Sequence, residues 1–284
     1  MLIALMFQIL APIFPADTIR VGIVGDSQLN AFNTYDAICR DMRAQGISLW
    51  VGLGDHVQDH GLPGEWQRLF DGPMAPLAGV PRLGAIGNHD DILGYSAHVW
   101  QIPQHPLTSP YGNAIGCWGA VTWGPVRFVF LDTNEDPTIR LSLAPQQRQG
   151  TWLQAELASL DWQQARWRIA VWHHPVAVEF WDGGCFYPAL PERRWLFDSL
   201  ALAGCHLALN GHSHAYHRGD WRGTRWIISG GGGGWLDTTH CQDLPEITVA
   251  TAQWHWLLMQ VDPTALTIQA RNVQGQVIDQ LVLR

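Results

Sequence analysis

Five short motifs rich in Asp, Asn and His could together hold metal ions. Strand-like apolar runs lead into Gly25-Asp26-Ser27-Gln28, Gly54-Asp55-His56-Val57-Gln58, Gly87-Asn88-His89-Asp90, His173-His174-Pro175 and Gly211-His212-Ser213-His214. Loops at the carboxyl ends of strands in an open α/β sheet converge on one crevice, so we expect these side chains to meet there. Carboxylate and amide oxygens mixed with imidazoles suit Mn, Fe or Zn, and the absence of thiolates from the motifs argues against a structural zinc site.

Each motif taken singly has a simpler explanation. A Gly-Asp pair after a strand is more often a turn or a helix cap. His212 and His214 could be polar residues of a loop. The five motifs in this order along nearly the whole chain are far less common by chance, and we therefore interpret them together.

The elements that would position these motifs follow an alternating α/β pattern. Strands are predicted at residues 19–24, 49–53, 83–86, 127–131, 168–172, 206–209 and 226–228, and helices at 34–44, 145–159 and 192–202. Residues 254–261, 266–272 and 277–283 then read as a β-meander. With no internal linker or repeat, we expect one domain over residues 17–284.

The motifs, written GD, GDxxQ, GNHD, HHP and GHSH, resemble those of the calcineurin-like metallophosphoesterase superfamily. GNHD and GHSH are its most specific signatures. The His-x-Pro pattern at residues 173–175, the glycine-rich turn at 230–234 and the C-terminal meander are most similar to the acid-phosphatase branch related to purple acid phosphatases. The resemblance implies an α/β fold, a four-layer α/β/β/α sandwich, that holds two divalent or mixed-valence metal ions of Mn, Fe or Zn.

The resemblance also assigns roles to single residues. Asp55 would bridge the two ions, Asp26 and His214 would complete one site, and Asn88, His173 and His212 would complete the other. Gln28 or Gln58 could add a carbonyl oxygen to the first ion, and Gln28 has the better spacing. His89 would be the catalytic residue that stabilises or protonates the leaving oxygen. His174 and His217 flank the motifs and are expected to contact the substrate.

Two positions depart from the family pattern. The acid-phosphatase branch has an iron-binding Tyr where this chain has Gln58, so we expect no tyrosinate colour. Many members have a His at the position of Gln28. Phosphoprotein-phosphatase relatives place an Asp at position 58 to orient the catalytic His, and this chain lacks that side chain.

These observations predict a metal-dependent phosphoesterase, specifically a phosphomonoesterase in which a metal-bridging hydroxide attacks phosphorus directly. Phosphodiester cleavage, including cyclic or nucleotide diesters, uses the same ligands and stays open. A non-catalytic binding scaffold is the alternative of another class, and it would predict eroded ligands and loss of His89.

The composition of the chain restricts the kinds of partner that it is expected to bind. The chain has a net charge of −8 and its 17 cationic residues are all Arg, which argues against a general nucleic-acid surface. Its apolar first segment, residues 2–14, is too short and too interrupted by Pro12 for a transmembrane span. We therefore expect a small phosphate ester as ligand, and no protein partner is indicated.

The first 16 residues and the cysteines bear on location. Residues 1–16 read as a signal peptide without a basic start, or else as an N-terminal hydrophobic strand, so export is favoured slightly over a cytoplasmic location. In an exported protein Cys185 and Cys241 are the pair expected to form a disulfide. Cys39 and Cys205 lie in apolar sequence and are expected to pack as small hydrophobic residues.

Overall fold

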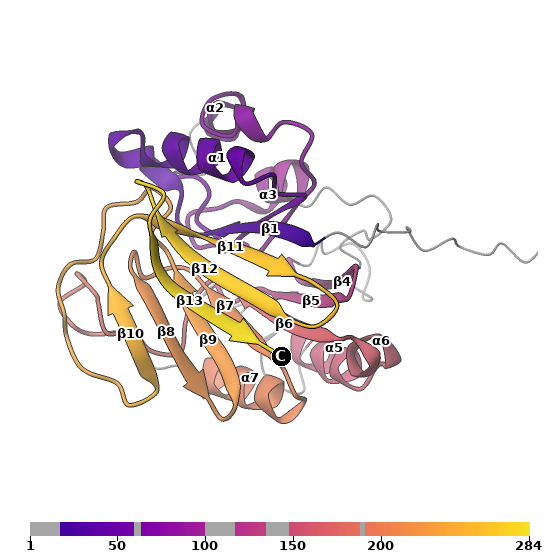
Figure 1. The fold of residues 1–284 in the computed structure, drawn as a ribbon. Coiled ribbons are helices and arrows are strands. Elements are labelled where there is room, and N and C mark those ends of the chain that lie inside the picture. The colour runs from indigo at the N-terminus through magenta and orange to yellow at the C-terminus, as the bar shows by residue number, and fades with distance from the viewer. Residues whose placement is uncertain (1–17, 60–63, 100–116, 135–147, 188–190) are drawn as a thin grey trace, which may run out of the picture.

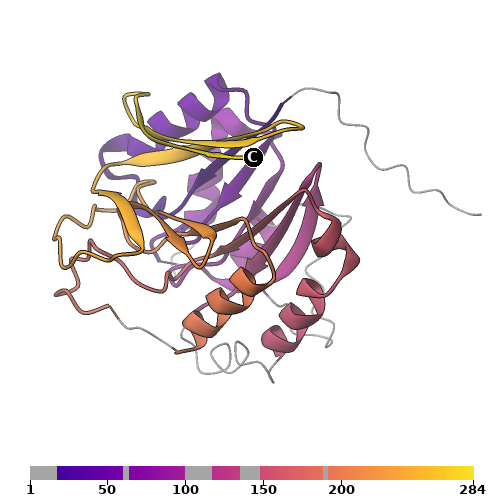
Figure 2. The same cartoon turned by 60° about the horizontal axis from the view of Figure 1, so that its bottom comes forward.

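The structure, a computed structural model, describes residues 18–59, 64–99, 117–134, 148–187 and 191–284. Two mixed β-sheets pack face to face, and helices cover the outer face of each (Figure 1; Figure 2). The predicted four-layer α/β/β/α sandwich is confirmed. The expected signal peptide at residues 1–16 lies outside the described residues.

The first sheet has six strands in the order β13-β12-β11-β1-β2-β3. Strands β1 (Ile19–Val24), β2 (Leu49–Gly52) and β3 (Arg82–Gly84) run parallel. The predicted C-terminal meander is present as β11 (His255–Val261), β12 (Leu266–Asn272) and β13 (Val277–Leu283), and β11 pairs antiparallel with β1. The meander therefore extends the sheet that carries the first three motifs.

The second sheet has seven strands in the order β10-β8-β9-β7-β6-β5-β4. Strands β5 (Val126–Leu131), β6 (Trp167–Trp172), β7 (Leu207–Asn210) and β9 (Thr224–Ser229) are parallel. Strands β4 (Gly119–Trp123), β8 (Tyr216–Trp221) and β10 (Ile247–Thr251) are antiparallel to their neighbours. The sequence did not predict these last three. Arg218, Gly219 and Asp220 interrupt the apolar pattern of β8, and β4 and β10 are short strands that are only partly buried.

Helices α1 (Thr34–Ala44), α2 (Glu65–Asp71) and α3 (Ile92–His98) cover the first sheet. Helices α5 (Arg148–Leu157), α6 (Leu160–Gln164) and α7 (Pro191–Leu202) cover the second (Figure 2). Two 3₁₀ segments, η1 (Gln28–Asn33) and η2 (Ala75–Leu77), complete the described elements. The short helices α2, α3 and α6 were not predicted because so few turns show little periodicity. Residues 145–147 of the predicted 145–159 helix lie outside the described residues.

Side chains along the strands of the second sheet alternate between two hydrophobic clusters. On β5, Phe128 and Phe130 belong to the hydrophobic cluster between the two sheets, whereas Val129 and Leu131 belong to the cluster under the outer helices. Both faces of this sheet are therefore buried, which explains its nearly continuous apolar strands.

The predicted disulfide between Cys185 and Cys241 is present. Cys39 and Cys205 are buried free thiols, as expected, and so is Cys117. In the part of the chain that the structure describes, no helix is long and apolar enough to cross a membrane.

Candidate metal centre

The five motif loops meet at one edge of the two sheets, because β1, β2, β3, β6 and β7 all end there. Main-chain hydrogen bonds join the loops, from Asp26 N to the Gly54 oxygen at 3.0 Å and from Gly211 N to the His173 oxygen at 3.1 Å. Gly54 has a φ of 95°, and a Cβ at this position would come 2.5 Å from His173 Nδ1. The glycine therefore lets the loop after β2 approach the loop after β6.

One group of candidate ligands surrounds Nε2 of His173. This atom lies 3.1 Å from Asn88 Oδ1, 3.2 Å from Asp55 Oδ2 and 3.2 Å from His212 Nδ1. Nδ1 of His173 donates a hydrogen bond to the Leu53 carbonyl at 2.8 Å, which leaves Nε2 to face the other three donor atoms. All four residues were predicted as ligands, and the structure brings them together.

The second group lies on the other side of Asp55. Nε2 of His214 is 3.5 Å from Asp26 Oδ1 and 3.3 Å from the Gln28 amide, and that amide is 3.4 Å from Asp55 Oδ2. Satisfying the hydrogen bonds of Gln28 puts its nitrogen on the Asp55 carbonyl and its oxygen toward His214. Gln28 thus presents a carbonyl oxygen to the group.

Backbone amides and strained backbone fix the two carboxylates. Asp26 accepts hydrogen bonds from His212 N at 3.0 and 2.9 Å, and Asp55 accepts one from His89 N at 2.8 Å. Asp26, Asp55 and His212 have φ values of 60°, 52° and 71°. Such left-handed conformations are costly for residues other than glycine and cluster at functional sites.

The two buried carboxylates of the cluster favour positive charge close to them. Burial raises the pKa of both carboxyls, but at Asp55 the neighbouring His173 and His89 together outweigh it and hold the pKa below the ordinary value. Burial opposes protonation of His173 and His214, yet the neighbouring carboxylates raise the pKa of each to about 9. The carboxylates thus favour positive charge beside them, which either protonated imidazoles or bound cations can supply, and divalent cations match this donor set.

His89 is oriented by the main chain. Its Nδ1 donates to the carbonyl oxygen of Gln58 at 2.7 Å, so Nε2 is the nitrogen left for other partners. The sequence has no Asp at position 58 to orient His89. The peptide carbonyl of Gln58 orients the ring instead.

His174 lies against the same cluster, with its ring 4.3 Å from that of His212. The Thr133 hydroxyl accepts from His174 N at 3.1 Å and lies 3.2 Å from His174 Nδ1. The hydroxyl hydrogen can donate to Nδ1, an arrangement compatible with a proton on Nε2. Burial and the neighbouring His212 and His173 hold the pKa of His174 well below its usual range.

The structure places His217 elsewhere. Its Nε2 accepts hydrogen bonds from the backbone amides of Glu179 and Phe180, both at 3.2 Å, and the ring is buried in β8. These contacts position the loop that carries Glu179 and Phe180, and His217 lies outside the two groups of candidate ligands.

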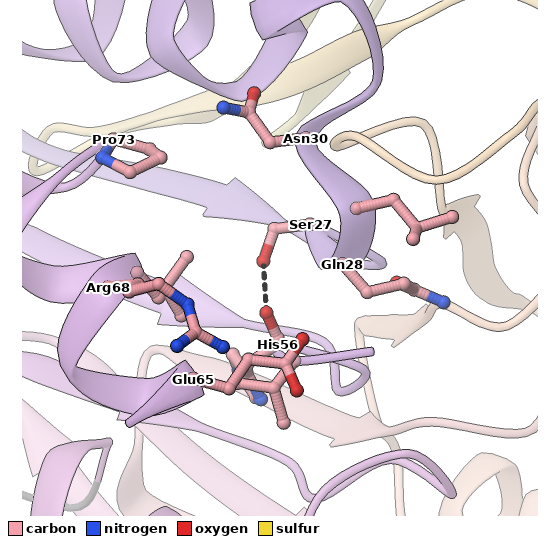
Figure 3. A pocket seen from close by; sticks show the side chains of 10 residues that line it. Ser27, Gln28, Asn30, His56, Glu65, Arg68 and Pro73 are labelled. Carbon is pink, nitrogen blue, oxygen red and sulfur yellow. Dashed lines mark hydrogen bonds between the residues drawn. The ribbon is translucent and has the colours of Figure 1, made fainter. Parts of the chain in front are cut away.

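A pocket of about 240 Å³ lies beside the loop that carries Gln28. Figure 3 shows its Ser27 hydroxyl bonded to the His56 carbonyl, at 3.2 Å, while the Gln28 side chain points away from Arg68 and Glu65. Gln28 is thus shared by the wall of the pocket and the ligand group around His214.

Sequence reasoning missed several residues that hold the ligands in place. Asp90 accepts from His56 N, His56 Nδ1 and Gly87 N, each at 2.8 Å, and so ties two motif loops together. Asp237 accepts from His214 N at 2.8 Å. Asp90 ends the GNHD motif and could have been found there, whereas Asp237 and Thr133 carry no local signal.

Comparisons with known proteins agree with this geometry. A family model described as calcineurin-like phosphoesterase matches residues 19–216. No curated protein matches the chain. Purple acid phosphatase PPD1 from yellow lupin (Lupinus luteus) seeds is similar in structure, with a TM-score of 0.74 and 20% identity over 95% of this chain and 54% of that one. GAP50, the anchor in the inner membrane complex of Plasmodium, has a TM-score of 0.70 and 13% identity over 94% and 89%.

A dimetal phosphatase from Danio rerio is also similar, with a TM-score of 0.57 and 14% identity over 93% of this chain and 98% of that one. At these identities the likeness concerns the fold. This chain spans 54% of the length of the lupin phosphatase. The expected superfamily is confirmed by the family model, and the likeness to the lupin phosphatase is one of fold.

Proposed function

The chain belongs to the calcineurin-like phosphoesterase family, and we propose that it is a metal-dependent phosphomonoesterase acting on small phosphate esters. One observation carries the proposal. Asp55 Oδ2 lies 3.2 Å from His173 Nε2 and 3.4 Å from the Gln28 amide, so a single carboxylate oxygen faces both groups of ligands. A shared carboxylate of this kind is what a two-metal phosphoesterase site needs.

The residues fit two ions of Mn, Fe or Zn. One would be held by Asp26, His214, Gln28 and Asp55, and the other by Asp55, Asn88, His173 and His212. When bound, the ions would polarise the phosphoryl group and make water a better nucleophile at neutral pH. Gln28 is preferred to Gln58 as the amide ligand, because its oxygen is directed toward His214.

His89 is the proposed general acid. Its Nδ1 is committed to the Gln58 carbonyl, so a proton on Nε2 is held in one direction and can pass to the leaving oxygen.

His174 is the proposed substrate-binding residue. With the Thr133 hydroxyl donating to Nδ1, the ring would carry its proton on Nε2 and would bond a non-bridging phosphoryl oxygen. Because burial keeps this ring neutral, it adds a donor without adding repulsion toward nearby cations.

Attack by water directly on phosphorus is favoured over a covalent phosphoenzyme. The free thiols Cys39, Cys117 and Cys205 are buried, and burial raises the pKa of each. The hydroxyls of Ser27 and Ser213, inside the motifs, donate to carbonyls of His56 and Phe180. Inversion at a chiral phosphate is therefore expected, and retention would contradict direct attack.

The test compares an aryl phosphomonoester with a phosphodiester of the same leaving group, with Mn, Zn and Fe added in turn. Turnover dominated by the monoester supports the proposal, whereas preference for the diester makes the protein a phosphodiesterase. His89→Ala should abolish turnover and leave bound metal unchanged. Failure of wild-type protein on both esters with every metal would favour a scaffold role, and a protein described as an anchor shares this fold.

We further propose that the protein is exported. The Cys185–Cys241 disulfide supports this location, because disulfides persist mainly in oxidising compartments. Edman sequencing of protein recovered from the medium or periplasm tests it.

A further inference from the structure

Three aromatic rings gather at the surface beside the ligand His214, and the proposed chemistry does not use them. Phe32 and Trp235 are 74% and 60% exposed. The Phe32 ring centroid lies 5.3 Å from that of Trp235 and 5.7 Å from that of Trp254, both in edge-to-face geometry. We call Phe32, Trp235 and Trp254 the aromatic platform. Exposed clusters of large apolar rings commonly mark binding surfaces.

The platform is tied directly to the candidate metal centre. The Trp235 carbonyl accepts a hydrogen bond from His214 Nδ1 at 2.6 Å. A Cβ on Gly234 would lie 2.5 Å from His214 Cε1, so this stretch of main chain packs on the imidazole. Trp254 Nε1 donates to the Gly234 carbonyl at 3.0 Å. The rings therefore have a fixed position relative to the ligand that faces Asp26.

Strained backbone holds Phe32 outward. Leu29, Asn30, Phe32 and Asn33 have φ values of 67°, 45°, 54° and 56°, in the left-handed region that costs free energy for such residues. A hydrogen bond from Ala31 N to the Gly233 carbonyl, at 2.8 Å, ties this segment to the glycine-rich loop. The strained backbone costs free energy, and it leaves exposed an aromatic ring that would be more stable if it were buried. Such backbone strain is typical of functional sites.

We propose that the aromatic platform binds a flat aromatic ring in the leaving group of the substrate. The inference rests on the proposed function, since the phosphoryl group is placed at the metal centre. In an edge-to-face pair each ring keeps at least one face free of its partner, and such a face can stack on a nucleobase or an aryl ring. The substrate class is therefore phosphomonoesters that carry an aromatic ring.

The test uses substrate pairs that share one leaving oxygen. A nucleoside 5′-monophosphate and ribose 5-phosphate differ only in the base, and benzyl and propyl phosphate test a simple aryl ring. Trp235→Ala should lower kcat/KM for the ring-bearing substrate about 5- to 100-fold, the usual effect of losing one stacking ring, and change the ring-free partner less than about twofold. Phe32→Leu should act in the same direction. The pair that responds identifies the ring as a nucleobase or as an aryl group.

Phe186→Ala is the matched control, because Phe186 is 77% exposed but belongs to a different loop. It should leave both members of each pair unchanged. An equal loss on both members after Trp235→Ala would indicate a structural role and overturn the proposal. Unchanged kcat/KM for all four substrates would overturn it as well.

A second readout separates this proposal from the proposed function. Saturation-transfer NMR on the base protons of a nucleoside, which has no phosphate, requires neither metal nor turnover. A signal with wild-type protein that Trp235→Ala removes supports the platform even if no ester is hydrolysed. Absence of a signal for wild-type protein, together with equal kcat/KM for the members of each pair, overturns the platform and leaves the phosphoesterase assignment standing.

Discussion

The carbonyl oxygen of Gln58 lies 2.7 Å from Nδ1 of His89 and accepts its hydrogen bond. Glu65 in turn holds the loop, because its carboxylate oxygens accept from Gln58 N and Asp59 N, both at 2.9 Å. The His89 imidazole is therefore oriented by a peptide group, and the identity of side chain 58 is secondary to the shape of its loop.

This relationship predicts different effects for two neighbouring substitutions. Gln58→Ala keeps the carbonyl and should change kcat by less than about twofold, whereas Glu65→Ala releases the loop and should lower kcat about tenfold. Steady-state kinetics with metal analysis checks both, and Glu65→Gln should restore part of the rate. A larger loss for Gln58→Ala than for Glu65→Ala would show that the side chain matters instead.

Asp55→Asn should be the most damaging change to metal binding. Its carboxylate faces both ligand groups, so the substitution should weaken both sites and lower activity at least about 100-fold. Asp26→Asn should weaken one site more than the other. Metal content by mass spectrometry checks the difference, with Asp243→Asn, whose side chain is 95% exposed, as control. Retention of two ions by Asp55→Asn would rule out a shared ligand.

The sequence was sufficient for the parts of the site that are local. Short apolar runs precede Asp26, Asp55, Asn88, His173 and His212 in the sequence, so the strand ends could be recognised and their convergence followed from parallel order. The orientation of His89 could not be predicted, because its partner is a main-chain carbonyl whose position depends on the loop. Asp237 and Thr133 reach their histidines through tertiary contacts that leave no local pattern.

For His217 the sequence predicted a site residue that the structure places outside the ligand groups. Its place three residues after His214 suggested a site residue, but β8 turns its ring into the protein to accept two backbone amides. Proximity in sequence does not imply a shared site, because His214 lies in the loop before β8 whereas His217 lies within the strand. The aromatic platform was missed for a related reason, since Phe32, Trp235 and Trp254 are far apart in sequence.

Iron-loaded protein should show no tyrosinate absorption band in the visible region. Gln58 stands at the position expected for an iron-binding tyrosine in the acid-phosphatase branch. The nearby Tyr187 hydroxyl is engaged, donating to the Pro175 carbonyl at 3.1 Å and accepting from Arg193 at 3.2 Å. Tyr111 lies outside the described residues. Absorption spectra recorded during ferric titration check this, and an intense visible band that Tyr187→Phe removes would contradict it.

Reduction of the Cys185–Cys241 disulfide should reduce stability and activity together. The bridge joins residues 56 apart in sequence, and loop-closure entropy of this length corresponds to about 4 kcal/mol in the chain-entropy model. It also clamps the loop whose Trp181 ring lies 5.1 Å from the His212 ring. Urea unfolding and kinetics with and without reductant check both effects. The Cys185→Ser/Cys241→Ser protein should be insensitive to reductant, and equal sensitivity would implicate another thiol.

His255 should make the protein less stable in mild acid. Its Nδ1 donates to the Gln253 carbonyl at 2.7 Å and its Nε2 is 2.9 Å from the Ser229 hydroxyl, an arrangement that suits the neutral ring. Burial lowers the pKa of His255 to about 4, whereas an unfolded histidine titrates near about 6.5. Between these values the unfolded state binds more protons, so the free energy of unfolding falls as the pH drops below about 6.5.

Removing this group should flatten the pH dependence. From pH ~7.5 to ~5 the linkage amounts to about 2 kcal/mol, so His255→Gln should lose about that much less stability over the interval than wild-type protein. Urea unfolding of both proteins after metal removal measures the difference, because the candidate metal ligands then titrate equally in each. The variant starts from a lower free energy of unfolding at neutral pH, so only the slope is diagnostic. Parallel slopes would mean that His255 is not held neutral in the folded protein.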